Sequence, residues 1–155
     1  MRIALFDSGY GGLTVLSHAR RVLPSEEFIF YADRDHVPYG TKSVPAVRGF
    51  VRTAFRFLIE QQRADAVVVA CNTATSVAVD EMRRLYDVPI IGMEPAVKKA
   101  LTRDAEHRVL VTATPITVHG EKLKRLISSC DPNGLVDLQR DRHRRPERYL
   151  RIDLL

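Results

Sequence analysis

The sequence has few cysteines and no long apolar run, and both absences exclude whole classes of protein. Its two cysteines, Cys71 and Cys130, form no metal-ligand spacing and no disulfide framework, so we expect neither a zinc site nor a secreted disulfide scaffold. The apolar stretch at the amino terminus is too short for a signal peptide, and no later run reaches membrane-spanning length. We therefore expect a cytoplasmic protein with no membrane partner and no metal.

Evidence for a nucleotide or a nucleic acid is also weak. No phosphate-binding loop of the form Gly-Lys-Ser or Gly-Lys-Thr occurs. The net charge is +5, but six arginines and three acidic residues between Gln139 and Leu155 supply three of those charges. No aromatic stacking pattern accompanies these arginines, which favours a solvated tail over a nucleic-acid arm. We expect no nucleic-acid partner.

The 155 residues are 45% apolar, which is enough for a hydrophobic core, and strand-like segments alternate with helical ones. This alternation predicts an α/β fold in which helices flank a mostly parallel sheet. The clearest helices are expected over Val47–Ile59, from its apolar spacing, and over Thr73–Leu85. Strands are expected at Arg2–Phe6, Phe28–Ala32, Ala66–Ala70, Pro89–Ile91 and Arg108–Thr112.

Cys71 lies where the apolar strand Ala66–Ala70 meets the helix Thr73–Leu85. The N-terminal end of a helix favours a thiolate and can also hold a substrate carboxylate, so Cys71 is a candidate nucleophile or base. A buried structural cysteine is the alternative, because free cysteine is among the most buried residue types.

Asp7 ends the first predicted strand and opens a glycine loop, in the place where open α/β sheets bind ligands. Gly9-x-Gly11 begins like a dinucleotide-binding loop. However, Thr14 occupies the position of the third glycine, and Asp7 would bring negative charge close to a pyrophosphate, so we expect no nucleotide cofactor. A turn or helix-cap role for Asp7 remains an alternative.

Adjacent strands would bring Asp7 and Cys71 together across one cleft, with Asn72, Thr73 and Thr114 at the same rim. Such a site could take a proton from a carbon next to a carboxylate, with the thiolate as general base. Asp7 could orient the thiol, accept its proton or pair with a substrate ammonium group.

The other candidate reaction is attack of Cys71 on a carbonyl group, which would require a positioned histidine. His36 is the only histidine in a predicted rim loop, which runs from Asp33 to Ser43 and is longer than packing requires. The sequence leaves both reactions open.

Five segments carry a family resemblance that covers roughly Arg2 to Leu138. They are Phe6 to Leu16 (Phe-Asp-Ser-Gly-Tyr-Gly-Gly-Leu-Thr-Val-Leu), Val37 to Gly40 (Val-Pro-Tyr-Gly), Ala70 to Ala74 (Ala-Cys-Asn-Thr-Ala), Pro89 to Ala96 and Val111 to Val118. In this order they resemble the glutamate racemases of the cofactor-independent aspartate/glutamate racemase group. Several linked motifs are far more specific than one.

The resemblance implies a reaction that interconverts L- and D-glutamate without a cofactor and supplies the D form for peptidoglycan. Cys71 would be one of two acid/base cysteines on opposite faces of the α-carbon, and glutamate would be the substrate. The implied substrate contacts are Asp7, Ser8, Tyr39, Gly40, Asn72, Thr73 and Thr114.

The sequence departs from this family in one respect. The second catalytic cysteine belongs to a Gly-Cys-Thr-His segment, which does not occur here, and Cys130 lacks those flanking residues. The resemblance therefore implies one Rossmann-like racemase lobe (residues 1–98), the start of a second (99–138) and an arginine-rich tail (139–155), which is expected to be disordered or aberrant. That tail has the look of a reading-frame change or a premature stop.

We expect impaired racemisation and an exposed apolar surface that favours association, for example as a homo-oligomer. The alternatives are a related aspartate or hydantoin racemase and a non-catalytic binding fragment.

Overall fold

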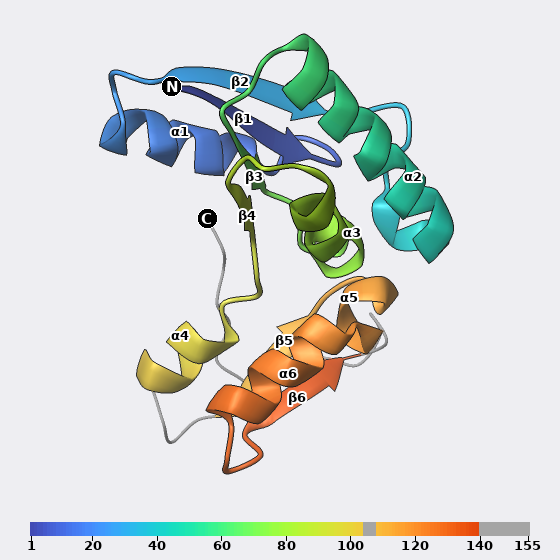
Figure 1. Cartoon of the computed structure of the whole chain (residues 1–155). Coiled ribbons are helices and arrows are strands. Elements are labelled where there is room, and N and C mark those ends of the chain that lie inside the picture. Colours follow the sequence, from blue (N-terminus) through green and yellow to red (C-terminus); the bar gives the residue numbers. More distant parts are fainter. Residues whose placement is uncertain (104–107, 140–155) are drawn as a thin grey trace. The chain divides into compact units, whose positions relative to one another are not determined.

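The computed structural model describes residues 1–103 and 108–139. The chain divides into two compact units, Met1–Met93 and a second that begins at Glu94 (Figure 1). The sequence placed the division between residues 98 and 99, within what is α4 (Val97–Arg103) of the second unit. Each unit is described by itself.

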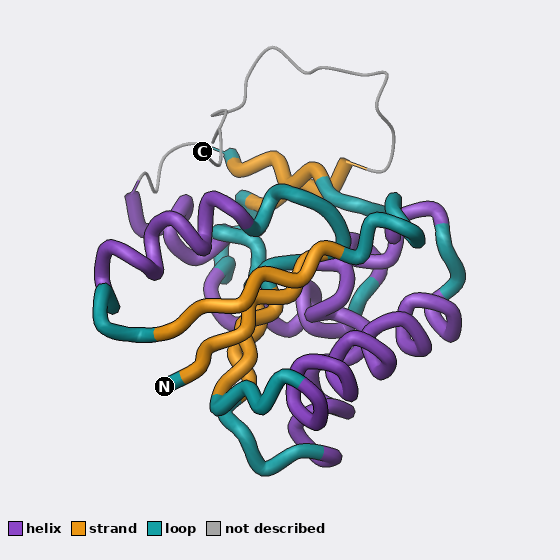
Figure 2. Tube along the Cα trace, turned by 90° about the horizontal axis from the view of Figure 1, so that it is seen from above, coloured by secondary structure: helices purple, strands orange, loops and turns teal. Residues whose placement is uncertain are grey.

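The first unit is built on a four-stranded sheet of order β2-β1-β3-β4, in which every neighbouring pair is parallel. The strands lie side by side in orange in Figure 2. Each strand begins and ends within one residue of its predicted bounds, so the predicted α/β fold with a mostly parallel sheet is confirmed. The strands are β1 (Arg2–Asp7), β2 (Glu27–Ala32), β3 (Ala66–Val69) and β4 (Ile90–Gly92).

Helices flank this sheet on both faces. Phe6 and Tyr31 form a register pair and contact the rings of Phe55 and Phe57, so the segment that contains these two residues covers one face. Phe30 points to the other face, toward the glycine loop that leads into α1. The helical segments are α1 (Leu13–Val22), η1 (Tyr39–Thr41, a single 3-10 turn), α2 (Val44–Phe55), η2 (Arg56–Gln61) and α3 (Asn72–Leu85).

The helix predicted over Val47–Ile59 is present, but its hydrogen bonding changes along its length. It begins after Ser43, whose side chain accepts the N–H of Ala46. At Arg56 the α-helical pattern gives way to a π-helix, η2, which a side-chain pattern cannot reveal. The buried side chains of α2 follow the predicted apolar spacing: Val47, Val51, Ala54 and Phe55.

The second unit contains α4, β5 (Val109–Thr112), α5 (Pro115–His119), α6 (Glu121–Cys130) and β6 (Val136–Gln139). β5 and β6 form a parallel two-stranded sheet, and an apolar cluster that includes Val109, Val111 and Leu123 packs between sheet and helices. The sequence did not predict β6, because four residues of alternating polarity are too short a pattern to separate from a loop.

Strand pairing extends into the range that the sequence assigned to the tail. Gln139 is the last residue of β6, where the backbone pairs with Thr112. Residues 140–155 lie outside the described residues. No helix in the described ranges is both long and apolar enough to span a bilayer.

Candidate active site

The carboxyl ends of β1 and β3 lie next to each other at one edge of the sheet. Phe6 pairs with Val69, and the N–H of Ala70 donates to the Phe6 carbonyl at 2.8 Å. The next residues along the two strands are Asp7 and Cys71. The structure therefore brings to one edge the two residues that the sequence expected across one cleft.

Cys71 is the N-cap residue of α3 and is 8% exposed. Its Sγ accepts the N–H of Ala74 at 3.4 Å and lies 3.3 Å from the Oγ of Ser8. A thiolate in this place would receive one backbone donor and one hydroxyl donor, together with the partial positive charge of a 14-residue helix. Cys71 is thus a buried N-cap residue, and its sulfur also lies beside two donors that would stabilise the thiolate needed for a base.

Asp7 is also buried, and its carboxylate holds the glycine loop in place. One oxygen accepts the N–H of Ser8 and the other accepts the N–H of Gly12, each at 2.9 Å. These two bonds give Asp7 the loop-capping role that the sequence left as an alternative. They also fix Ser8, whose hydroxyl meets the thiol of Cys71.

Gly12 allows the glycine loop to approach the end of β3. A Cβ atom on Gly12 would lie 2.9 Å from the Cβ of Ala70, closer than real Cβ atoms come, and 3.0 Å from the Cβ of Asp7, which is a very tight contact. A side chain at this position would push the loop, and Ser8 with it, away from Cys71.

Tyr39 lies in η1 and is 2% exposed. Its hydroxyl donates to Asp33 at 2.5 Å, and its ring lies 6.4 Å from that of Phe6, centre to centre. Burial first, then the hydrogen bond to Asp33 and the nearby charges of Asp33 and Cys71, raise the pKa of Tyr39 above its ordinary value. Tyr39 therefore stays a hydrogen-bond donor, and it lies within electrostatic reach of the thiol. Gly40, which follows it, is partly buried.

Asn72 and Thr73 form the first turn of α3, next to Cys71. Thr73 is buried. The Oδ1 atom of Asn72 is buried and finds no hydrogen-bond partner in the described part of the chain. A buried acceptor without a partner is unfavourable, so this atom is suited to receive a donor from a ligand, such as an ammonium group.

Thr114 belongs to the second unit, where it is the N-cap residue of α5 and its Oγ1 accepts the N–H of Thr117. Its predicted contact with substrate remains a prediction. Cys130, at the end of α6, packs against the apolar cluster of the same unit, as expected of a structural thiol.

Asp33 and His36 have a role that sequence reasoning missed. The sequence suggested His36 as a partner of Cys71. In the structure the Nδ1 atom of His36 instead lies 2.8 Å from Oδ1 of Asp33, and the His36 ring stacks on Phe50 with ring centres 3.8 Å apart. Asp33, which the sequence identified only as the start of the rim loop, accepts the hydroxyl of Tyr39. The available signal was a carboxyl residue at the end of a strand, six positions before Tyr39.

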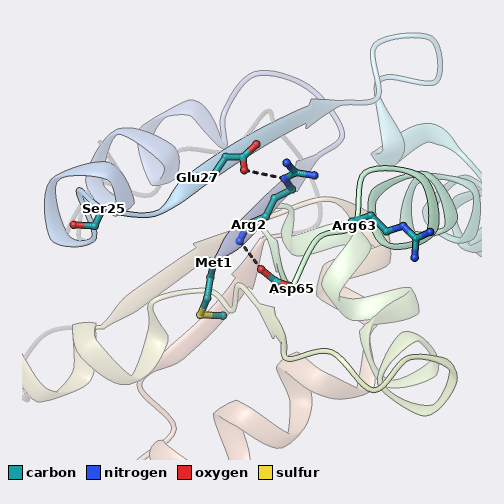
Figure 3. A pocket seen from close by; sticks show the side chains of 6 residues that line it. All are labelled: Met1, Arg2, Ser25, Glu27, Arg63 and Asp65. Atoms are coloured by element: carbon teal, nitrogen blue, oxygen red, sulfur yellow. Dashed lines mark hydrogen bonds and ion pairs between the residues drawn. The ribbon is translucent and has the colours of Figure 1, made fainter.

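A second polar region lies at the opposite edge of the sheet, where the strands begin. It is an open pocket of about 380 Å³, and none of the predicted site residues lines it (Figure 3). Arg2 pairs there with Glu27 at 3.0 Å, and its backbone N–H donates to Asp65 at 2.6 Å. The lining residues are Met1, Arg2, Ser25, Glu27, Arg63 and Asp65.

Comparison with known proteins identifies the family. A family model described as Asp/Glu/Hydantoin racemase matches residues 13–144. The chain is 56% identical over 144 residues to the glutamate racemase of Campylobacter curvus, which covers 89% of this chain and 54% of that protein. It is 50% identical over 137 residues to the glutamate racemase of Halothermothrix orenii, with 88% and 54% covered.

Solved structures agree with these sequence matches. Glutamate racemase from Aquifex pyrophilus matches with a TM-score of 0.79 and 33% identity, over 89% of this chain and 54% of that one. The Escherichia coli glutamate racemase, solved with L-glutamate and the activator UDP-MurNAc-ala, matches with a TM-score of 0.81 and 32% identity, over 88% and 52%. The chain spans about half the length of the curated relatives it matches. It belongs to the Asp/Glu/Hydantoin racemase family.

Proposed function

We propose that this chain carries one half of a glutamate racemase site, in which Cys71 exchanges the α-proton of glutamate on one face. The observation that carries the proposal is the position of the Cys71 sulfur, between the Ser8 hydroxyl and the N–H of Ala74 at the start of α3. The names of the relatives support glutamate as substrate, as does the Escherichia coli structure with L-glutamate.

In the proton-transfer step the Cys71 thiolate takes the α-hydrogen of glutamate as a proton and becomes a thiol. The electron pair of the broken C–H bond moves into the α-carboxylate, and the reverse step restores the C–H bond. The donors from Ser8 and Ala74 stabilise the thiolate before the transfer. No oxidant or electron sink is required by this exchange.

Substrate anchoring falls to the residues around the thiol. The Oδ1 atom of Asn72 can accept the ammonium group of glutamate, since it is buried without a partner in the described structure. N–H groups at the start of α3 can receive a carboxylate. Asp7 acts on this site through the glycine loop, because both of its oxygens accept backbone N–H groups there.

Net inversion requires a second base on the opposite face of the α-carbon. The family resemblance assigns that role to a second cysteine in a Gly-Cys-Thr-His segment, and Cys130 lacks those flanking residues. The chain by itself is therefore expected to exchange the α-proton with retention of configuration. In a racemase with both bases the same half-site would contribute to making D-glutamate for peptidoglycan.

Incubation of the purified chain with L- or D-glutamate in D2O tests the proposal. Proton NMR should show loss of the α-proton signal from one enantiomer without formation of the other. The two cysteines of the chain give a matched pair of variants: Cys71→Ala should abolish the exchange, and Cys130→Ala should leave it unchanged. Exchange that survives in Cys71→Ala, or no glutamate binding by the wild-type chain, would contradict the proposal.

The family description also includes aspartate and hydantoin racemases, and the same assay separates them. Aspartate and a 5-substituted hydantoin replace glutamate under identical conditions. Faster Cys71-dependent exchange with either compound would reassign the substrate while leaving the role of the thiol in place.

A further inference from the structure

Asp33 follows β2 and is buried, with 5% of its surface exposed. Its backbone N–H donates to the carbonyl of Asp7 at 3.0 Å, which ties it to the sheet edge that carries Cys71. Burial of a carboxyl group is unfavourable unless hydrogen-bond donors replace the lost water. The buried carboxylate of Asp33 is therefore stable only while its hydrogen-bond donors stay in place.

Both side-chain partners of Asp33 come from the loop that follows it. Tyr39 donates its hydroxyl to Oδ2 at 2.5 Å, and the Nδ1 atom of His36 lies 2.8 Å from Oδ1. The rings of both residues also pack on Phe50 of α2, with centres 3.8 Å away for His36 and 5.8 Å for Tyr39. Asp33 thus joins the end of β2, the loop and α2.

The same loop contacts the glycine loop beside Cys71. A Cβ built on Gly9 would lie 3.7 Å from a methyl group of Val37, in ordinary contact. The ring of Tyr39 also lies 6.4 Å from that of Phe6, centre to centre, and the Phe6 carbonyl accepts the N–H of Ala70, the residue before Cys71. Displacement of the loop would therefore change what surrounds a substrate at Cys71.

We propose that Asp33 is the positioning residue of the loop that runs from Asp33 to Ser43: it holds Tyr39, and with it Gly40, beside Cys71 and thereby sets the affinity for glutamate. This role rests on the proposed function. Asp33 acts through Tyr39 and takes no part in proton transfer. Its loss should raise the glutamate concentration needed for half-maximal exchange far more than it lowers the exchange rate at saturation.

Three variants of the full chain test this role: Asp33→Asn, Tyr39→Phe and the double variant. Asp33→Asn should raise the half-saturating glutamate concentration about tenfold, the size expected for one hydrogen bond to a charged group. The rate at saturation should change by less than about threefold. Asp35→Asn is the matched control, since it makes the same chemical change at an exposed position of the same loop and should have neither effect.

The double variant decides whether Asp33 works through Tyr39. If both residues act through the same hydrogen bond, the double variant should bind glutamate no more weakly than the single variant that binds it less tightly. Fully additive effects, or Asp33→Asn with wild-type affinity, would overturn the proposal while the proposed function stands. If Asp33→Asn fails to fold by circular dichroism, Tyr39→Phe removes the same hydrogen bond and must show the same weakening.

A readout without glutamate keeps the two proposals separate. NMR should detect a Tyr39 hydroxyl proton that exchanges slowly with water in the wild-type and Asp35→Asn chains and rapidly in Asp33→Asn. Equal exchange in all three would overturn the positioning role. A wild-type chain that shows the slow proton but does not bind glutamate would overturn the proposed function and leave Asp33 as a structural clamp only.

Discussion

The two edges of the first unit's sheet both carry polar residues, but these residues differ in burial and in their hydrogen-bond partners. At the carboxyl edge, Asp7 and Asp33 are buried and bonded to backbone or loop donors, and Asn72 keeps a buried acceptor without a partner in the described structure. At the amino edge, Arg2 and Glu27 form an ion pair with side chains 38% and 60% exposed. Buried, directed groups can act on a substrate, whereas exposed ion pairs are screened by water.

The first way to break this comparison is to remove the thiol from the carboxyl edge. Cys71→Ser should lower the rate of α-proton exchange by at least about 100-fold, because a serine hydroxyl is a far weaker acid than a thiol and does not supply the base. Deuterium incorporation into glutamate measures the rate. Exchange that falls equally in Cys130→Ser would show that the loss does not come from the carboxyl edge.

The glycine loop offers the second test, through stability. Gly12→Ala should lower the free energy of unfolding by about 1–3 kcal/mol, because its Cβ would overlap Ala70 and Asp7. Gly49→Ala is the control: it lies inside α2 with open space around it and should raise stability by about 0.5–1 kcal/mol. Urea unfolding of both variants should give changes of opposite sign.

The buried hydroxyl of Tyr39 predicts a pH dependence. Because its pKa is raised in the folded chain, its contribution to stability is complete below about pH 10, the ordinary value for tyrosine, and is lost as pH rises toward the folded pKa. Above pH 10 the unfolding free energy of the wild-type chain should therefore fall by up to about 1.4 kcal/mol per pH unit more than that of Tyr39→Phe. If the unfolding free energies of the two chains change in parallel with pH, the Tyr39 hydroxyl is not buried and hydrogen-bonded to Asp33.

The smallest effect is expected at the amino edge. Glu27→Gln removes the ion pair with Arg2 and should cost less than about 1 kcal/mol, with a smaller difference at high salt. The rate of α-proton exchange in glutamate should not change. A large drop in exchange would mean that this edge, and the pocket in Figure 3, contributes to the reaction.

Local patterns predicted more of the fold than of the site. The strand that precedes Cys71 and the helix that follows it were recognised because apolar runs and helical periodicity are properties of neighbouring residues. β6 was missed because its four residues gain their stability by pairing with β5, a partner more than twenty residues away. The π-helical end of the helix predicted over Val47–Ile59 was missed because it depends on backbone hydrogen bonding, which the side-chain pattern does not encode.

The sequence by itself determined the order of β1 to β5, the position of Cys71 at the start of a helix and the resemblance to a racemase family, since each depends on local pattern or matched segments. Only the tertiary structure decided that Ser8 meets the thiol, that Asp7 caps its own loop and that His36 turns to Asp33. The physical reason is that a side chain's hydrogen bonds are set by which groups burial leaves within reach, and parallel pairing brings together residues far apart in the chain.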